Sequence, residues 1–276
     1  DAVIKWAYQT LGGKLFAPVL VGSSLLSRIL GWYFDSRWSR AKSAKAIVDL
    51  DINVDEFAQP QHTFKSFNDF FMRKLKPEAR PFSDDPIDFL SPADGRLLVH
   101  DDIVGDSCVQ VKGIEGPLSA LFDRDMDDFH GGKVAVLRLC PADYHRFHFP
   151  CTGTVTEQVK LNGKYHSVNP IALNAQRSVF CRNKRSYALM DTERFGRLAF
   201  MEVGAFGVAG IHQTFTGPQA ERMQEKGYFD FGGSTIVLVF QKNTIEFSAD
   251  LVKHSQQGIE TLVKVGQTIG QAANTA

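Results

Sequence analysis

Residues 234–240 read Ser-Thr-Ile-Val-Leu-Val-Phe, a short run that is rich in branched side chains and lies directly after the glycine pair Gly232-Gly233. A short run of this kind that is bounded by glycine is typical of a strand. Residues 133–139 (Lys-Val-Ala-Val-Leu-Arg-Leu) and 197–203 (Arg-Leu-Ala-Phe-Met-Glu-Val) have the same character. The three runs together predict the central strands of a β-sheet.

The segments around these runs indicate how the strands are connected. Pro92-Ala-Asp-Gly95 and Pro150-Cys-Thr-Gly153 each precede a strand-like run, and a third turn is expected within residues 265–270. Long helical patterns do not alternate with the strands, which disfavours a doubly wound α/β sheet. We therefore expect an α+β, mainly β fold: an antiparallel β-sandwich or distorted barrel core with N-terminal amphipathic helices.

Composition narrows the class of protein. The chain has 276 residues, is 43% hydrophobic, and carries 31 basic and 31 acidic residues. This apolar content is enough for a sizeable core and excludes disorder, while zero net charge argues against a general nucleic-acid binder. None of the four cysteines has CxxC spacing, so we expect free thiols and a reducing compartment. They are Cys108, Cys140, Cys151 and Cys181.

The N-terminal segment differs from the remainder. Residues 1–45 carry seven basic against two acidic residues and contain all three tryptophans, Trp6, Trp32 and Trp38. The longest uncharged run, between Lys14 and Arg28, has 13 residues, and a membrane-spanning helix needs about 20. Apolar residues at near-helical spacing favour a helix lying in a membrane interface. A helix packed on its own domain, or a dimer contact, remains the alternative. These apolar residues are Leu15, Val19, Leu26, Ile29, Leu30 and Tyr33.

Residues 64–75 predict a short helix. Ser66 is placed as its N-cap with Asp69 at the third helical position, and Pro77 follows its end. Pro81, Pro86 and Pro92 then indicate an extended linker. We therefore expect a helical, membrane-associating segment over residues 1–80 and a β-rich catalytic domain over residues 81–276.

Two histidines lie close together in Tyr144-His145-Arg146-Phe147-His148. In a strand the side chains of residues 145 and 148 would point to opposite faces, whereas a turn could bring them to one site. A metal would need further ligands, and the other candidates are scattered, so we expect no metal site. Those candidates are His130, His166 and His212.

Asp94 and Ser234 each have a structural and a chemical interpretation. Asp94 precedes Gly95, a common arrangement in a turn, and Gly233-Ser234 could likewise be part of a hairpin turn. A nucleophile elbow needs a helix after the serine, whereas here a strand is expected, so a serine hydrolase fits poorly. A serine after glycine can instead attack the carbonyl of the preceding residue if a base removes its proton.

Several segments, taken in order, resemble the pyruvoyl-dependent phosphatidylserine decarboxylase family. The resemblance covers roughly residues 60–245, and the final motif resembles the Gly-Gly-Ser-Thr subtype. The chain departs from the family pattern at Phe206–Gly210 and at Met223, a position where the family commonly has glycine. These departures affect the walls of the site and turns rather than the catalytic residues. The matching segments are Phe67-Asn-Asp-Phe-Phe71, Lys74-Leu-Lys-Pro77, Ser91-Pro-Ala-Asp-Gly95, Tyr144–His148, Ser167-Val-Asn-Pro170, Asn183-Lys-Arg185, Val203-Gly-Ala205 and Gly227–Thr235.

The resemblance implies self-cleavage between Gly233 and Ser234. The products would be a β chain of residues 1–233 and an α chain of residues 234–276, with Ser234 converted to a covalent pyruvoyl group. Asp94 would orient and charge His148, and His148 would deprotonate Ser234. His145 would assist decarboxylation or protonate the product, with Tyr144 and Arg146 as weaker candidates for ordering the site or contacting phosphate.

The implied reaction converts phosphatidylserine to phosphatidylethanolamine and CO₂ through a Schiff base to the pyruvoyl group, without an external cofactor. The implied partners are a phospholipid membrane, phosphatidylserine and the two chains of one precursor, with a homodimer left open and no nucleic acid expected. The expected location is the cytoplasmic face of a bacterial inner membrane, as a peripheral (monotopic) protein, with a eukaryotic endomembrane as the alternative. Two other functions stay open: decarboxylation of a free aromatic amino acid, and a non-enzymatic lipid-binding β-sandwich.

Overall fold

The computed structural model describes residues 24–100, 117–163, 181, 183–207 and 210–273. Among the segments named above, Trp6, Cys108, His166 and Ser167-Val-Asn-Pro170 lie outside the described residues. Lys14, Leu15 and Val19 of the N-terminal segment also lie outside them. Within the described chain, Cys140 and Cys151 are free thiols.

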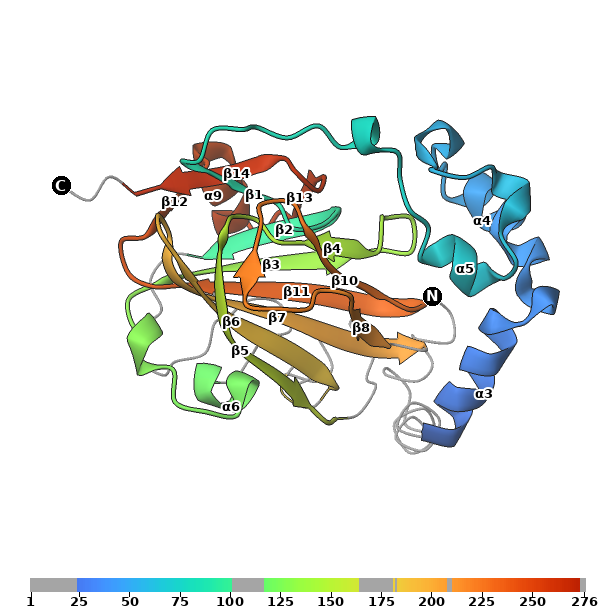
Figure 1. Cartoon of the computed structure of the whole chain (residues 1–276), viewed down its shortest axis with the longest axis horizontal. Coiled ribbons are helices and arrows are strands. Elements are labelled where there is room, and N and C mark those ends of the chain that lie inside the picture. Colours follow the sequence, from blue (N-terminus) through green and yellow to red (C-terminus); the bar gives the residue numbers. More distant parts are fainter. Residues whose placement is uncertain (1–23, 101–116, 164–180, 182, 208–209, 274–276) are drawn as a thin grey trace.

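An antiparallel sheet of eight strands forms the centre of the molecule (Figure 1). Each of the three runs that predicted strands lies in it, so those predictions are confirmed. The order across the sheet is β13 (Thr261–Val263), β2 (Gly95–His100), β3 (Lys133–Leu139), β11 (Gly232–Phe240), β7 (Gly196–Gly207), β6 (Arg185–Thr192), β5 (Gly153–Leu161) and β9 (Gln219–Ala220).

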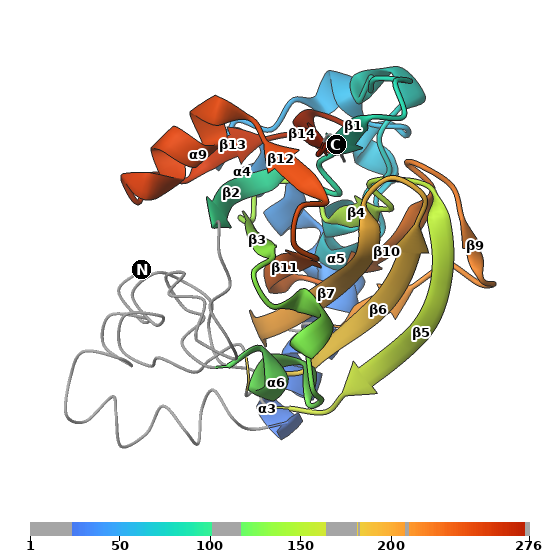
Figure 2. The same cartoon turned by 90° about the vertical axis from the view of Figure 1, so that its left-hand side faces the viewer.

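Two antiparallel sheets of three strands complete the β structure, and the long strands β5, β6 and β7 curve strongly (Figure 2). The mainly β, α+β expectation is confirmed. One small sheet has the order β1 (Asp88–Leu90), β14 (Thr268–Ala272) and β12 (Ile245–Phe247), and the other has β4 (Arg146–His148), β10 (Glu225–Phe229) and β8 (Ile211–Gln213).

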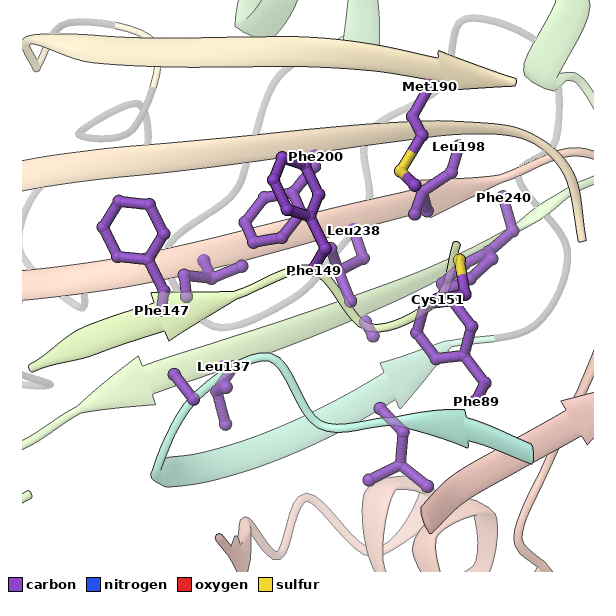
Figure 3. Packing of buried hydrophobic residues seen from close by; sticks show 14 of the residues in the cluster. Phe89, Leu137, Phe147, Phe149, Cys151, Met190, Leu198, Phe200, Leu238 and Phe240 are labelled. Carbon is purple, nitrogen blue, oxygen red and sulfur yellow. The ribbon is translucent and has the colours of Figure 1, made fainter. Parts of the chain in front are cut away.

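From Ile236 to Phe240 strand β11 is apolar, and this part is buried on both faces of the sheet. Ile236, Leu238 and Phe240 join one core cluster, while the alternate residues Val237 and Val239 join another on the opposite face of the sheet. This is the period of two that a pleated strand imposes. The first cluster is rich in phenylalanine rings and fills the space between the large sheet and the smaller ones (Figure 3).

The helices are short and most precede residue 80. In the part of the chain that the structure describes they are α3 (Ser24–Asp35), α4 (Ala41–Asp49), α5 (Phe67–Phe71), α6 (Leu118–Phe122) and α9 (Ala249–Gln256). Single 3₁₀ turns are η1 (Arg37–Ser39), η2 (Val54–Glu56), η3 (Gln61–Thr63), η4 (Pro77–Ala79) and η5 (Asp127–Phe129). Helices α3, α4 and α5 lie together at one end of the central sheet (Figure 1).

Helix α5 confirms the predicted start signal. The Ser66 hydroxyl accepts a hydrogen bond from the Asp69 backbone N–H at 3.1 Å, and the Asp69 carboxylate accepts one from the Lys65 N–H at 2.8 Å. The helix ends at Phe71, earlier than expected. Between α5 and β1 the chain contains the 3₁₀ turn η4, and strand β1 lies between Pro86 and Pro92, within the linker that the prolines predicted.

Candidate active site

Ser234 lies near the start of β11 and is fixed by strands on both sides. Its backbone pairs with Leu139 of β3 and with Gly204 of β7. The residue is 1% exposed, and its Oγ has no hydrogen-bond partner. The Asn183 side chain donates to the Gly204 carbonyl at 2.9 Å, which holds the neighbouring strand in place.

The two glycines before Ser234 form an irregular part of the strand pair. Gly232 pairs with Gly207 and Ser234 with Gly204, so Gly233 alone opposes two residues of β7. This is a β-bulge, a feature that is frequent beside active sites. Gly232 has a φ of 155°, which a residue with a side chain rarely adopts. The peptide before Ser234 therefore lies at a break in the regular ladder.

Strand order brings the other predicted residues to the same end of the sheet. Strand β3 ends at Leu139 and leads directly into residues 140–148, while the neighbouring β2 begins at Gly95, just after Asp94. Adjacent strands are about 4.8 Å apart. Three neighbouring strands therefore carry Asp94, the 140–148 segment and Ser234 at the same end of the sheet.

His145 is fully buried between the helical segment and the sheet. Its Nδ1 lies 2.9 Å from the Asp143 carbonyl oxygen, and its ring stacks on Phe71 with centroids 3.8 Å apart. Burial, reinforced by the charge of Arg73, lowers the pKa of His145 to about 3. Because a carbonyl only accepts, Nδ1 carries the proton, and Nε2 is left with a free lone pair.

His148 is tied to the turn that carries Asp94. Its backbone N–H donates to the Pro92 carbonyl at 2.8 Å. Burial lowers the pKa of His148 to about 4, against the opposing effects of Glu225 and Asp94. Its Nδ1 is buried and has no hydrogen-bond partner. Both histidines of the predicted pair are therefore neutral at pH 7.

Asp94 is buried and is held by a residue that the sequence analysis did not single out. Arg80 donates to both carboxylate oxygens, from Nε at 3.0 Å and from Nη2 at 2.6 Å, and the Val265 N–H donates to Oδ1 at 2.8 Å. The described hydrogen bonds of Asp94 thus go to Arg80 and Val265. Its proposed interaction with His148 is electrostatic in this structure, and the triad stays a prediction.

Tyr144 and Arg146 occupy supporting positions. Burial raises the pKa of Tyr144, whose ring lies over His148 with centroids 6.0 Å apart. Arg146 donates to the Met72 carbonyl at 2.8 Å and to both Glu225 oxygens at 2.9 and 3.0 Å. Because these bonds tie the end of α5 to β10, Arg146 is better suited to ordering the site than to contacting phosphate.

Buried polar atoms without partners are concentrated here. More than nine in ten buried polar groups in proteins are hydrogen-bonded, so each exception needs a reason. Arg73, whose Nη2 donates to the carbonyls of Ala142 and Asp143, adds two such atoms and lines a cleft of about 170 Å³ beside Asp94. The six atoms are Arg73 Nε and Nη1, His145 Nε2, His148 Nδ1, Ser234 Oγ and Thr235 Oγ1.

The other histidines do not form a metal centre in the described part of the chain. No group of three or more histidine, cysteine or acidic side chains is placed to hold a metal ion among these residues. His212 instead pairs with Asp230 at 2.8 Å, and this contact raises its pKa. His130 lies 3.2 Å from Asp127 on the surface.

A buried, unpartnered serine lies at the same end of the sheet as the segment that carries His145 and the half-buried His148, and this makes that end the candidate active site. Residues 67–271 match the family model described as "Phosphatidylserine decarboxylase". A "Phosphatidylserine decarboxylase proenzyme" of Clostridium botulinum (strain Langeland) is 44% identical over 98% of this chain and 92% of its own length.

Proteins with the same name in Clostridium novyi (strain NT) and Clostridium perfringens (strain SM101) are 42% and 41% identical. They cover 98% and 97% of this chain, each over 92% of its own length. The chain belongs to the phosphatidylserine decarboxylase family. The resemblance inferred from the sequence motifs is confirmed.

Proposed function

We propose that this protein decarboxylates phosphatidylserine to phosphatidylethanolamine and CO₂, after cutting its own chain between Gly233 and Ser234. The observation that carries the proposal is the Ser234 hydroxyl, which is buried without a partner directly after two glycines at a bulge. Family membership over nearly the whole chain supports the reaction and its substrate.

The self-cleavage balances with residues of this chain and water. The Ser234 Oγ attacks the Gly233 carbonyl carbon, an ester C–O bond forms, and the peptide C–N bond breaks. His148 takes the hydroxyl proton and returns it to the released nitrogen. A base removes the Cα proton of residue 234 as the Gly233 carboxylate leaves, which gives dehydroalanine at position 234. This enamine tautomerises to an imine, and addition of water releases ammonia and leaves a pyruvoyl group on residues 234–276.

His148 is suited to be the base because it is neutral, and because two nearby carboxylates oppose the effect of burial, which lowers its pKa. Asp94 and Glu225 both favour the protonated ring. Arg80 fixes the Asp94 carboxylate on two oxygens. We assign Arg80 the role of holding Asp94 beside His148, so that the charge needs no reorganisation during the reaction.

Position 234 fits a pyruvoyl group because it is enclosed and the existing oxygen has no partner to lose. The ketone would supply an acceptor for the electrons released when CO₂ leaves. His145 presents the lone pair of Nε2 inside the same buried region, while Nδ1 is held by the Asp143 carbonyl. His145 must therefore accept a proton at Nε2 before it can deliver one to the product.

The helical segment within residues 1–80 would hold the enzyme against the membrane, with residues 81–276 as the catalytic domain. Trp32, Trp38 and Val48 of the helical segment are 69%, 78% and 80% exposed. Arg37 and Lys45 on the same elements are also exposed. Exposed tryptophan and apolar side chains beside cations favour binding in a lipid interface.

No helix in the described residues is long and apolar enough to cross a membrane.

One experiment separates the proposed reaction from its alternatives. Intact mass of the purified protein should give two fragments, the second starting at position 234 and carrying a ketone that borohydride reduces. Ser234→Ala should remain one chain. Phosphatidylserine in vesicles should release CO₂ and free aromatic amino acids should not. An uncut wild-type chain contradicts the proposal, and turnover of free amino acids alone moves the enzyme to the alternative substrate.

Membrane binding is tested by point changes that leave the fold intact. The double change Trp32→Ser and Trp38→Ser should reduce sedimentation with anionic phosphatidylserine vesicles by about tenfold. Ile87→Ser, which removes a 39% exposed apolar side chain next to β1, is the matched control. Equal sedimentation of the double variant and wild type would remove the helical segment from this role.

A further inference from the structure

Helices α3 and α5 contact the chain immediately before the scissile peptide. Figure 1 places both helices at the end of the sheet where β11 begins. Phe231, three residues before Ser234, packs against Phe34 of α3 with ring centroids 4.4 Å apart. It also packs against Phe67 and Phe71 of α5, at 4.9 and 5.2 Å. Two helices of the expected membrane-associating segment thus reach the proposed site of cleavage.

Asn68 fixes the backbone at the same position. Its Oδ1 accepts a hydrogen bond from the Phe231 N–H at 2.9 Å. Its Nδ2 donates to Asp35 at 2.7 Å and lies 3.5 Å from Asp230. Because these carboxylates can only accept, they hold the amide with Oδ1 towards Phe231. Asn68 is 3% exposed, so water competes little for these bonds.

On the other side of the scissile peptide the chain is fixed by the sheet. From Ser234 to Phe240, every residue of β11 is paired with both β3 and β7. Only Gly232 and Gly233 lie between this strand and Phe231. The two glycines therefore span a short gap whose ends are both held.

We propose that Phe34, Phe67, Asn68 and Phe71 form a clamp on Phe231 that positions the Gly233 carbonyl for attack by the Ser234 hydroxyl. This inference rests on the proposed self-cleavage at residue 234. Without the clamp, the glycine pair would have many backbone conformations available. Attack requires the reacting atoms to be about 3–3.5 Å apart, and a misplacement of 1 Å can cost roughly a hundredfold in rate. Asn68 is a positioning residue in this scheme.

The clamp also links the scissile peptide to His145. Phe71 touches the ring of Phe231 on one side and stacks on His145 on the other, and the Phe229 N–H donates to the His145 carbonyl at 3.0 Å. The helical segment thus holds the peptide to be cut and one of the candidate catalytic groups with the same few residues. After cleavage, the clamp would hold only the new carboxyl-terminal tail, Phe231–Gly233.

The test compares the rate of self-cleavage with the activity of the cleaved enzyme. Asn68→Ala and Phe231→Leu should slow conversion of precursor into fragments by about ten- to a hundredfold, followed on denaturing gels from freshly made full-length chain. CO₂ release per mole of pyruvoyl, titrated with hydrazine, should stay within about twofold of wild type, because after the cut Asn68 and Phe231 hold only the tail of residues 231–233, while Phe71, which contacts His145, is unchanged.

Phe64→Leu is the matched control. Phe64 belongs to the same aromatic cluster and is 1% exposed, but its ring contacts are with Phe57 and Phe70 rather than Phe231. This variant should lose a similar amount of thermal stability and cut at nearly the wild-type rate.

Three results would overturn the clamp: cleavage of both clamp variants at the wild-type rate, equal slowing in Phe64→Leu, or an equal fall in turnover per pyruvoyl. Phe231→Leu decides the matter if Asn68→Ala fails to fold. A wild-type chain that never cuts would instead overturn the proposed function, so the two failures are distinguishable.

Discussion

Two clusters of buried polar side chains in this molecule differ in how many of their polar atoms have a hydrogen-bond partner. In the core, the Lys226 ammonium donates to Glu202 at 2.6 Å and to Gln213 at 3.0 Å. The Ser186 hydroxyl donates to the second Glu202 oxygen at 2.6 Å, and Gln213 donates to Ser186 and Glu202. At the end of the same sheet, Ser234, Thr235, His145 and His148 keep polar atoms without partners.

The comparison gives a criterion for distinguishing a buried polar cluster with a structural role from one with a functional role. A closed network satisfies its own atoms and has nothing left with which to bind a substrate. An open one carries an energetic cost, and a chemical role of the free atoms is one reason for such a cost to be retained. By this criterion Lys226–Glu202 is structural, although a buried lysine could otherwise be taken for a catalytic group.

The largest effect is expected at Ser234. Ser234→Ala should abolish fragment formation altogether, while the folded precursor keeps its stability because the lost hydroxyl had no hydrogen bond. Mass spectrometry checks that no fragments form, and thermal melting of the same sample checks that the stability is unchanged. A precursor that unfolds would show that Ser234 has a structural role, and Ser234 would then no longer differ from the Lys226–Glu202 network in this respect.

The next effect is expected in the closed network. Glu202→Gln leaves the Lys226 ammonium buried without its counter-ion, which should cost about 3–5 kcal/mol. For a domain of this size that corresponds to a fall in melting temperature of roughly 10 °C. The pair replacement Glu202→Leu with Lys226→Met is the control and should lose much less. Little loss in Glu202→Gln would mean that the network is not what holds Lys226.

The two histidines predict how stability depends on pH. Their folded pKa values, about 3 for His145 and about 4 for His148, lie below the ordinary value of 6.5. The unfolded chain therefore takes up protons that the folded chain refuses. Stability should be complete above pH 6.5 and fall by a few kcal/mol towards pH 4.

This dependence is best measured by melting the uncut Ser234→Ala chain at each pH. Adding His148→Gln should flatten the curve between pH 6.5 and 4, because one of the two responsible groups is gone. His254→Gln, which changes a histidine of α9 away from the site, should leave the slope in place. An unchanged slope in His148→Gln would show that His148 titrates normally.

The smallest effects are expected when a single buried hydroxyl group is removed from each of the two clusters. Thr235→Val removes a buried hydroxyl that has no partner, and it should raise the free energy of unfolding by up to about 1 kcal/mol. Ser186→Ala removes one that is fully used and should lower that free energy by about 1–2 kcal/mol. Chemical denaturation of the uncut chain measures both, and shifts of the same sign would contradict the distinction.

Local signals predicted the regular elements well. The runs at residues 133–139, 197–203 and 234–240 and the Ser66 cap depend on side chains close in sequence, and all lie where they were expected. The substitution at Met223 can be understood only from the backbone. Met223 has a φ of 61°, a left-handed conformation, which explains why glycine is common there in the family.

The sequence alone determined the candidate serine, the histidine pair and the family, because these depend on residue types in a fixed order. The roles of Arg80 and Asn68 required the tertiary structure. Arg80 reaches Asp94 across 14 residues, and Asn68 reaches Phe231 across 163. No periodicity or spacing encodes such contacts, since they follow from which strand ends and helices meet after the core has packed. The sequence likewise does not show which buried polar atoms have hydrogen-bond partners. Only the folded structure distinguishes Ser234, whose hydroxyl has no partner, from Lys226, whose ammonium group is hydrogen-bonded.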